Sequence, residues 1–389
     1  TDANGNAVAF SYDANNRRTR TNYADGTFDQ VSYDTLGRQT AKTDQAGKTT
    51  QFAYDALGRL TSVTDALGQI TRYSYDEQGN QLTQTDAEGR ITRFAYDRMG
   101  RRISRTLPLG QTETFSYDVA GNLRPKTDFN GRTTSYAYDS VNRLLRKTPD
   151  GSLGQPPVVF SYTPSGQRAS MQDVSGSTTY SYDNRDRLLS KATPQGTLSY
   201  RYDAAGNLTR IQSNHPGGAA MDYSYDPRNR LASVTDAEGR VTTYSYDAVG
   251  NLAGFLYPNG VQTTYTYNPL NRLTNVTGAR GATTIAGYTY TLGPSGNRTA
   301  VTEASGRRAD YTYDDLYRLR SETISADPAG PNGAIAYTYD RVGNRLTRVS
   351  TVAGITDQSF NYDFNDSLDG EGYDNNGNTL TSGGRTFGY

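Results

Sequence analysis

The chain has 389 residues, with 40 glycines, 32 tyrosines and 11 phenylalanines, and it contains neither tryptophan nor cysteine. Its 40 basic and 40 acidic residues give a formal net charge of zero and are mixed along the chain. This balance argues against a surface for nucleic acid or an anionic membrane, because either would need a basic patch. The lack of cysteine excludes disulfides and thiolate metal sites, and no apolar run approaches the length of a membrane span.

From the first residues onward, tyrosine recurs at a fixed interval. Seven tyrosines are spaced by 21 residues, namely Tyr12, Tyr33, Tyr54, Tyr75, Tyr96, Tyr117 and Tyr138. The series continues with looser spacing at Tyr162, Tyr182, Tyr202, Tyr225, Tyr246, Tyr267, Tyr290, Tyr313, Tyr339 and Tyr362, and a last unit follows at Tyr373. Another large apolar residue stands two places before nearly every one, as Phe52 does before Tyr54. Residues two apart share one face of a strand, so the pattern predicts strands.

Each repeat tyrosine is followed by residues typical of a turn. Asp at the first turn position can accept a hydrogen bond from the backbone two residues on, and Gly at the fourth tolerates the left-handed conformation that closes a hairpin with a bulge. A second Asp-x-x-Gly turn, such as Asp65 to Gly68, lies halfway between successive tyrosines. The expected structural residues of the regular units are Tyr12, Asp13, Tyr33, Asp34, Gly37, Tyr54, Asp55, Gly58, Asp65, Gly68, Tyr75, Asp76, Gly79, Tyr96, Asp97, Gly100, Tyr117, Asp118, Gly121, Tyr138 and Asp139.

These units predict an all-β fold, since no run of ten or more residues has helical apolar spacing. Seventeen units give roughly 34 antiparallel strands in one long meander, about 160 Å wide along its hydrogen-bonding direction. So wide a twisted sheet must coil, and a single turn of that width would form a ring about 50 Å across. We expect residues 1–389 to be one β-shell segment, coiled into a spiral shell or part of a hollow barrel, with a cavity in place of a packed core.

The two kinds of turn are expected to lie on opposite edges of the sheet, because strands alternate in direction. Pro125 cannot donate a hydrogen bond and is expected to interrupt a strand ladder. Five insertions each replace a second turn, which predicts one smooth edge and one ragged edge that contacts neighbouring coils or partners. These insertions span residues 149–157, 213–221, 279–287, 325–334 and 350–358.

The residue five places after the repeat tyrosine alternates between arginine and an amide. Arg59, Asn80, Arg101 and Asn122 begin the series, which continues without a break to Asn344. Duplication of a 42-residue segment would explain the alternation. The physical alternative is a ladder along one edge, in which each arginine reaches the turn Asp of a neighbouring unit, as Arg101 would reach Asp76 or Asp118.

Residues that could carry chemistry are few. The one histidine, His215, stands between Asn and Pro in an expected loop, and the aspartates that follow the repeat tyrosines are accounted for by their turns. No calcium-loop, phosphate-loop or nucleophile motif is found. We therefore expect no enzyme activity, no cofactor and no catalytic, cofactor-binding or metal site, although an edge site for calcium or for a sugar stacked on tyrosine stays open.

The motif aromatic-x-Tyr-Asp-x-x-Gly-[Arg/Asn]-Leu, followed by Thr-Asp-x-x-Gly-Arg-x-Thr, resembles the YD repeat of the Rhs family. That family includes bacterial Rhs polymorphic toxins, the B and C components of Tc toxins, and teneurins. The resemblance covers essentially the whole chain and implies a spiral β-shell that encloses a toxin domain in the bacterial members. A self-cleaving core rich in Asp-Pro-x-Gly is not expected, because the stretch at residues 327–330 lies inside an ordinary repeat.

Two functions follow as hypotheses. The first is a structural shell segment of a secreted bacterial Rhs-type toxin, an excerpt of a longer protein, whose partners would be an enclosed toxin domain and flanking repeats of the same polypeptide. The alternative is a cell-surface or secreted adhesin that binds carbohydrate or a partner protein through its tyrosines. Either would place the chain outside the bacterial cell or on its surface.

Overall fold

The computed structural model describes residues 1–328 and 330–388, and its regular structure is almost entirely strand. Position 329, within the Asp-Pro-x-Gly stretch, lies outside the described residues. The first half contains β1 (Ala9–Tyr12), β2 (Arg18–Asn22), β3 (Phe28–Tyr33), β4 (Gln39–Thr43), β5 (Thr49–Tyr54), β6 (Leu60–Thr64), β7 (Ile70–Tyr75), β8 (Gln81–Thr85), β9 (Ile91–Tyr96), β10 (Arg102–Thr106), β11 (Thr112–Tyr117), β12 (Leu123–Thr127), β13 (Thr133–Tyr138), β14 (Leu144–Thr148), β15 (Val158–Tyr162), β16 (Arg168–Asp173), β17 (Gly176–Tyr182) and β18 (Leu188–Thr193). The second half contains β19 (Gly196–Tyr202), β20 (Leu208–Ser213), β21 (Ala220–Tyr225), β22 (Leu231–Thr235), β23 (Val241–Tyr246), β24 (Leu252–Leu256), β25 (Val261–Tyr267), β26 (Leu273–Arg280), β27 (Thr283–Leu292), β28 (Arg298–Glu303), β29 (Arg308–Tyr313), β30 (Leu319–Ser325), β31 (Gly333–Tyr339), β32 (Arg345–Ser350), β33 (Gln358–Ser359), β34 (Gly372–Tyr373), β35 (Thr379–Ser382) and β36 (Arg385–Thr386).

The strands form a meander. β1 to β33 make one 33-stranded antiparallel sheet in which each strand pairs with its neighbours in sequence, and β34 to β36 form a small sheet of their own. A single 3-10 turn, η1 (Gly151–Leu153), is the one helical element in the described part of the chain. That part holds no helix long and apolar enough to cross a membrane. The prediction of an all-β meander is confirmed.

Every regular unit closes its hairpin in the way that the sequence predicts. In the unit at Tyr54, the Asp55 amide donates to the Arg59 carbonyl and the Gly58 amide donates to the Asp55 carbonyl, each at 3.0 Å. The Asp55 carboxylate accepts the backbone N–H groups of Leu57 and Arg59 at 3.0 and 2.9 Å. Gly58 adopts the left-handed conformation with φ of 82°, and the strand register shifts next to Tyr54. This is the bulged turn expected of Asp and Gly at these positions.

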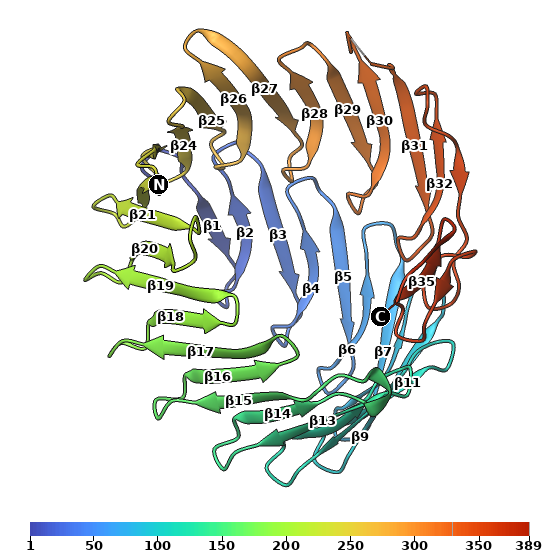
Figure 1. Cartoon of the computed structure of the whole chain (residues 1–389). Helices are drawn as coiled ribbons and strands as arrows, with labels where there is room; N and C mark the ends of the chain where they lie inside the picture. The colour runs from blue at the N-terminus through green and yellow to red at the C-terminus, as the bar shows by residue number, and fades with distance from the viewer. Residues whose placement is uncertain (329, 389) are drawn as a thin grey trace.

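The sheet coils through more than one turn (Figure 1). The turn after β4 meets the turn after β29, where Asp44 accepts a hydrogen bond from the hydroxyl of Tyr317, 273 positions away. The turn after β8 likewise meets the turn after β33, through Arg90 and Asp366. In both places 25 strands separate the two turns, which corresponds to a circumference of about 120 Å and a ring about 40 Å across. The ring is therefore narrower than the one expected from a single turn of the whole sheet.

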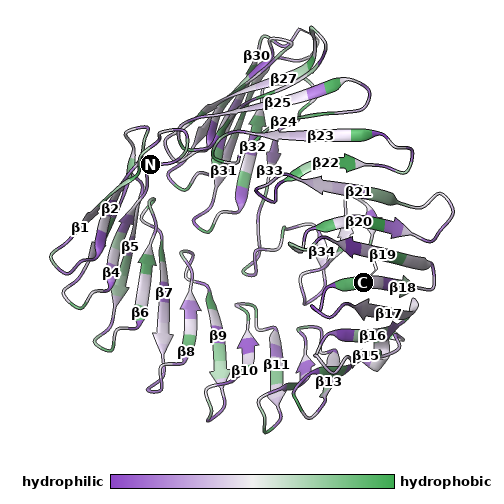
Figure 2. Cartoon of the chain, turned by 90° about the vertical axis from the view of Figure 1, so that its left-hand side faces the viewer, coloured by the Kyte–Doolittle hydropathy of each residue, from purple (hydrophilic) through white to green (hydrophobic). Residues whose placement is uncertain are grey.

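No second layer covers the sheet in the described part of the chain. Its buried apolar residues are only Ala300, Ala309, Ile335 and Val352. Hydrophilic and hydrophobic residues are mixed along the strands and are not gathered into a core (Figure 2). The expectation of a single curved wall without a dry sandwich interior is confirmed.

The rims of the sheet follow the predicted rule. We call the edge that carries the turns after the repeat tyrosines the Tyr-Asp rim, and the opposite edge the second-turn rim. All five insertions lie between an even-numbered strand and the next odd-numbered one, on the second-turn rim. The insertion at residues 279–287 differs in form, since β26 and β27 extend through it as a long hairpin.

Pro125 interrupts the ladder on one side, as expected. It pairs with Ser135 on β13, but on β11 the pairing passes from Phe115 to Tyr117 and omits Ser116. The corresponding Ser62 is paired on both sides. The missing proline N–H accounts for the gap.

Candidate functional site

The repeat tyrosines join each unit to the one before it. The Tyr54 hydroxyl donates to the carbonyl of Gln39 at 2.9 Å, and the Tyr75 hydroxyl donates to that of Leu60 at 2.8 Å. In both cases the acceptor is the residue that follows the arginine of the preceding turn. The same bond is made by Tyr33, Tyr117, Tyr162, Tyr182, Tyr202, Tyr225, Tyr246, Tyr267, Tyr313, Tyr339 and Tyr362. The hydroxyl thus ties adjacent Tyr-Asp turns together along the rim.

The arginine five places after the tyrosine makes three contacts at once. Arg59 donates through Nε to the Asp55 carboxylate at 2.6 Å and through a terminal nitrogen to the Asp76 carbonyl at 2.6 Å. Its guanidinium also lies 5.1 Å from the centre of the Tyr75 ring. The ring contact recurs for Arg17, Arg38, Arg101, Arg143, Arg187, Arg230 and Arg318. A planar guanidinium suits such a shared role because it donates along several directions while it stacks on an aromatic face.

The prediction that these arginines pair with the carboxylate of a neighbouring turn is wrong. Arg101 pairs with Asp97 of its own turn at 2.7 Å, and what it reaches in the next unit is the backbone carbonyl of Asp118. In Asp118 one carboxylate oxygen accepts the N–H groups of Ala120 and Asn122, and the other accepts the side-chain amide of Asn122, so both oxygens are engaged within their own turn. A ladder along the Tyr-Asp rim does exist, but its links between turns run to carbonyls and aromatic rings.

The amide units make a different link. Asn122 donates from its side chain to Asp118 at 3.1 Å and to the side-chain oxygen of Asn142 in the next turn at 2.7 Å. Asn142 occupies the position that Gly fills elsewhere and has a left-handed φ of 65°. Asn207 and Asn251 bond in the same way to the left-handed Asn229 and Asn271. The 42-residue period therefore has a structural counterpart, although its origin by duplication stays open.

Hydrogen bonds keep the turn carboxylates ionised. The backbone N–H of Arg59, followed by its guanidinium, lowers the pKa of Asp55 below the ordinary value of 3.8. The side-chain amide of Asn80 does the same for the pKa of Asp76. Asp150, in the first insertion, has a pKa lowered to about 2 by hydrogen bonds from Ser152 and Thr133. These shifts stabilise turns and by themselves indicate no catalytic group.

A second set of contacts joins the coils to each other. We call residues 1–256 the first coil, residues 261–388 the second coil, and the line where they meet the coil seam. At the seam, Tyr-Asp turns of the second coil dock on second turns of the first. Lys48 pairs with Asp315 at 2.5 Å, and the Tyr317 hydroxyl donates to Asp44. The Tyr-Asp rim of the second coil therefore meets the second-turn rim of the first coil, and regular turns make the contact.

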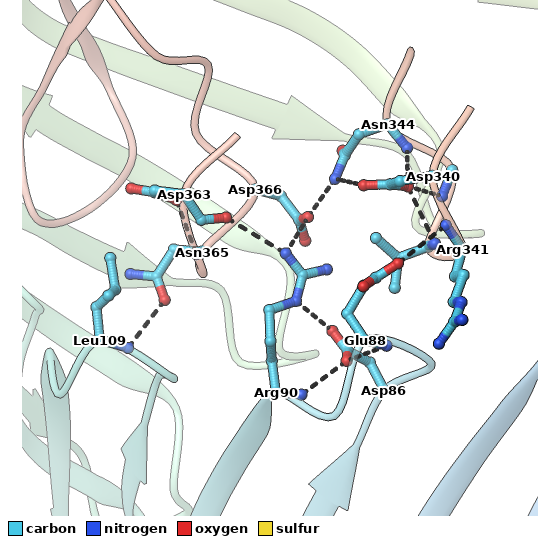
Figure 3. Close-up of polar contacts among 12 residues, drawn as sticks. Asp86, Glu88, Arg90, Leu109, Asp340, Arg341, Asn344, Asp363, Asn365 and Asp366 are labelled. Carbon is cyan, nitrogen blue, oxygen red and sulfur yellow. Dashed lines mark hydrogen bonds and ion pairs between the residues drawn. The ribbon is translucent and has the colours of Figure 1, made fainter. Parts of the chain in front are cut away.

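Arg90 lies among acidic side chains of both coils at the seam (Figure 3). It belongs to the first coil, bonds Asp86 in its own turn at 2.7 Å, and reaches across to the carboxylate of Asp366 at 2.8 Å. Its side chain is only 8% exposed. Beside it, the Glu88 carboxylate accepts the backbone N–H of Arg341 at 3.2 Å. One buried cation thus bridges acidic turns from both coils.

Further along the seam two similar turns bond each other reciprocally. Asn130 donates to the carboxylate of Asp374 at 2.8 Å, and Asn376 donates to that of Asp128 at 2.9 Å. The backbone N–H groups of Phe129 and Asn375 donate to the opposite Asn side chains. This pair of turns anchors β34 to β36 on the first coil.

His215 and the acidic turn residues were the other candidates for a chemical site. His215 lies exposed in the loop after β20, where its ring contacts the Pro216 carbonyl. Among residues 1–328 and 330–388, no group of three or more His, Cys, Asp or Glu residues could hold a metal ion. The expectations of no catalytic site and no cofactor are not tested by these contacts.

With this geometry established, comparison with known proteins identifies the family. The family model for the teneurin YD-shell matches residues 1–195, which is half of the chain. The chain belongs to the teneurin YD-shell family. The model for the RHS repeat matches residues 185–220, 225–256 and 246–283, so the two models together extend to residue 283. None of the curated proteins matches the chain.

Several solved structures share the fold of this chain. The structure described as TcdB2-TccC3-Cdc42 is similar to this chain with a TM-score of 0.82 and 18% identity, over 98% of this chain and 24% of that one. The structure of the Photorhabdus luminescens Tc holotoxin pore, described as mutation TccC3-D651A, is similar with a TM-score of 0.80 and 17% identity. The match again covers 98% of this chain and 24% of that one. This chain therefore spans about a quarter of the length of those chains.

The sequence pattern identified the turn residues but missed what they touch. Each predicted tyrosine, aspartate and glycine of the regular units stands at its expected place in a strand end or turn. The tyrosine hydroxyl bond was not predicted. Contact between the second-turn rim and a neighbouring coil was predicted and is confirmed, but the residues that make it were not. The fixed spacing of tyrosine and arginine could have suggested the hydroxyl bond, whereas contacts such as that between Asp44 and Tyr317 carry no local signal.

Proposed function

We propose that the chain is a wall segment of a bacterial toxin shell that encloses a toxin domain of the same polypeptide and has no enzyme activity of its own. The observation that supports this most is the single coiled sheet, in which 25 strands complete one turn and a second coil docks on the first. A wall of this kind has no core of its own to fill its middle, and it holds its shape through turn ladders. The likeness to chains of a Tc holotoxin agrees with this role. Such a protein acts after secretion, outside the cell that makes it.

Limited proteolysis of the complete parent polypeptide tests the proposal. The domain that the shell encloses should be cut much more slowly within the intact polypeptide than when it is produced alone, because the wall excludes the protease. Equal cleavage rates would contradict enclosure. Binding of this chain to immobilised glycans, together with equal cleavage rates, would favour the adhesin.

A further inference from the structure

A cavity lies beside each of two identical segments, Thr-Asp-Ala-Glu-Gly-Arg, at residues 85–90 and 235–240. The Asp and Arg of the segment, a threonine of the next strand and a proline of the following second turn line both cavities. In the second cavity these residues are Asp236, Arg240, Thr242 and Pro258, each 150 positions after its counterpart in the first. The two cavities are therefore equivalent places in the repeat.

A turn of the second coil occupies the first cavity. The carboxylate of Asp366 accepts from Arg90 at 2.8 Å, and the side chain of Asn365 accepts the backbone N–H of Leu109 at 3.3 Å. Phe364 lines the same cavity. The occupant is thus an Asp-Phe-Asn-Asp turn, which supplies a carboxylate, an amide oxygen and an aromatic ring.

The second cavity has the same arginine but no occupant in the described part of the chain. Its volume is about 570 Å³, against about 270 Å³ for the first. Arg240 bonds Asp236 through Nε at 2.6 Å and Glu238 through Nη2 at 2.9 Å, which leaves Nη1 without a partner among the described residues. Nη1 is the nitrogen with which Arg90 holds Asp366.

A backbone N–H beside each cavity also lacks an acceptor within its own turn. In a regular second turn the Asp at the first position accepts the N–H of the third residue, as Asp65 does for Leu67 at 2.9 Å. Leu107 and Tyr257 replace that Asp in the turns beside the two cavities, and their side chains accept no such bond. At the first cavity the docked turn supplies the acceptor, and at the second the N–H of Asn259 bonds to no described residue.

Tyr257 gives the second cavity an aromatic surface. Its ring centre lies 4.9 Å from that of Phe255 in an edge-to-face arrangement, and the residue is 43% exposed. Its hydroxyl has no hydrogen bond to the described residues, whereas Tyr23, which begins another second turn, donates to Asp29 at 2.7 Å. An aromatic ring on an occupant would meet Tyr257, and such pairs add stabilisation beyond the area that they bury.

We propose that the cavity at Arg240 and Tyr257 binds an acidic peptide turn of the kind seated at Arg90, with a carboxylate on the arginine and an aromatic ring on the tyrosine. The acidic residues beside Arg240 do not prevent this, because Arg90 is shared between the Asp of its own turn and Asp366. In a second copy of this chain the Asp366 turn is already seated, so a second copy does not supply it. The source is a further coil of the same polypeptide or a partner protein.

A cyclic peptide of residues 362–367, Tyr-Asp-Phe-Asn-Asp-Ser, is the probe that tests this inference. Ligand-observed NMR titration against the whole chain measures its dissociation constant. Arg240→Met in the chain, or Asp366→Asn in the peptide, should each weaken binding about fivefold, because a charged hydrogen bond at a partly exposed site is lost. Circular dichroism would confirm that the variant chain keeps its strands.

Arg210→Met is the matched control. Arg210 stands next to Ile211, which pairs with the cavity residue Met221, so its side chain points to the opposite face of the sheet. This variant should bind the peptide like the wild type. Absence of binding at about 1 mM peptide, or equal weakening by the two arginine variants, would overturn the proposal.

The complete parent polypeptide then separates the two sources of the turn. If the parent no longer binds the peptide although this chain does, a further coil of the same polypeptide fills the cavity. If the parent binds the peptide as this chain does, the cavity is open to a partner protein.

Discussion

Each repeat residue in this shell acts through a neighbouring unit. The turn aspartate shapes its own hairpin, but the tyrosine and arginine beside it bond to the turns before and after. Because hydroxyl, guanidinium and amide links recur at successive turns, the Tyr-Asp rim is held by many weak contacts of similar kind. Loss of one link should therefore have a modest and local effect.

Tyr75→Phe measures the contribution of one tyrosine link. The change removes the donor to the Leu60 carbonyl and should lower the free energy of unfolding by about 1 kcal/mol. Tyr73→Phe is the control, since it makes the same change on the same strand, where the hydroxyl has no hydrogen bond within the described chain. Urea denaturation compares the two. Equal losses would show that the bond to Leu60 contributes nothing.

The turn carboxylates also set the acid limit of the fold. The pKa values of Asp55 and Asp76 in the folded chain lie below 3.8, because the backbone N–H and guanidinium of Arg59 and the side-chain amide of Asn80 hydrogen-bond to their charged forms. A lowered pKa gives stability that is fully present above the ordinary value and is lost as pH falls through the folded value. Far-UV circular dichroism should therefore stay constant down to about pH 3.8 and change only below it. A cooperative loss of strand signal above that pH would contradict this assignment.

At the scale of the element, the sequence predicted strands and turns well because their causes are local. Alternating side chains define a strand, and Asp and Gly close a turn wherever they stand at the right spacing. Pro125 was also predictable, since a residue without an N–H must leave a gap in any ladder. The partner of Arg101 was not, because it depended on which acceptors of the next turn were already occupied.

Gly254, in β24, has a packing role that its sequence context does not reveal. A Cβ added there would lie 2.5 Å from the carbonyl oxygen of Thr263 on β25, whereas one at Gly278, in β26, would meet nothing closer than 3.8 Å. Gly254→Ala should therefore destabilise the chain by about 1–3 kcal/mol. Gly278→Ala should be neutral or stabilise by up to about 1 kcal/mol. Thermal unfolding of both variants checks the contrast, and equal effects would show that β24 and β25 separate freely.

At the scale of the whole molecule, the shape depends on contacts that no local pattern encodes. The segment Thr-Asp-Ala-Glu-Gly-Arg occurs twice, at residues 85–90 and 235–240. In the first copy Arg90 is 8% exposed at the coil seam, and in the second Arg240 is 62% exposed. Identical sequences thus have different environments, because only the first meets another coil after 25 strands. The sequence alone therefore could not have predicted that Arg90 is buried and Arg240 is exposed.

This pair of identical segments allows a matched test of the seam. Arg90→Met removes the cation between Asp86 and Asp366, whereas Arg240→Met removes one from a turn that no other coil covers. The first change should weaken docking of the second coil by about 1–2 kcal/mol, a value reduced from that of a buried pair because Asp366 is 48% exposed. Since the strand ladder does not cross the seam, circular dichroism should be the same for both variants. Small-angle X-ray scattering should show a larger radius of gyration for Arg90→Met only, and hydrogen exchange should rise in residues 340–388. An equal radius of gyration for both variants would contradict this prediction. It would mean that strand pairing alone determines the curvature of the sheet and that Arg90 does not contribute to it.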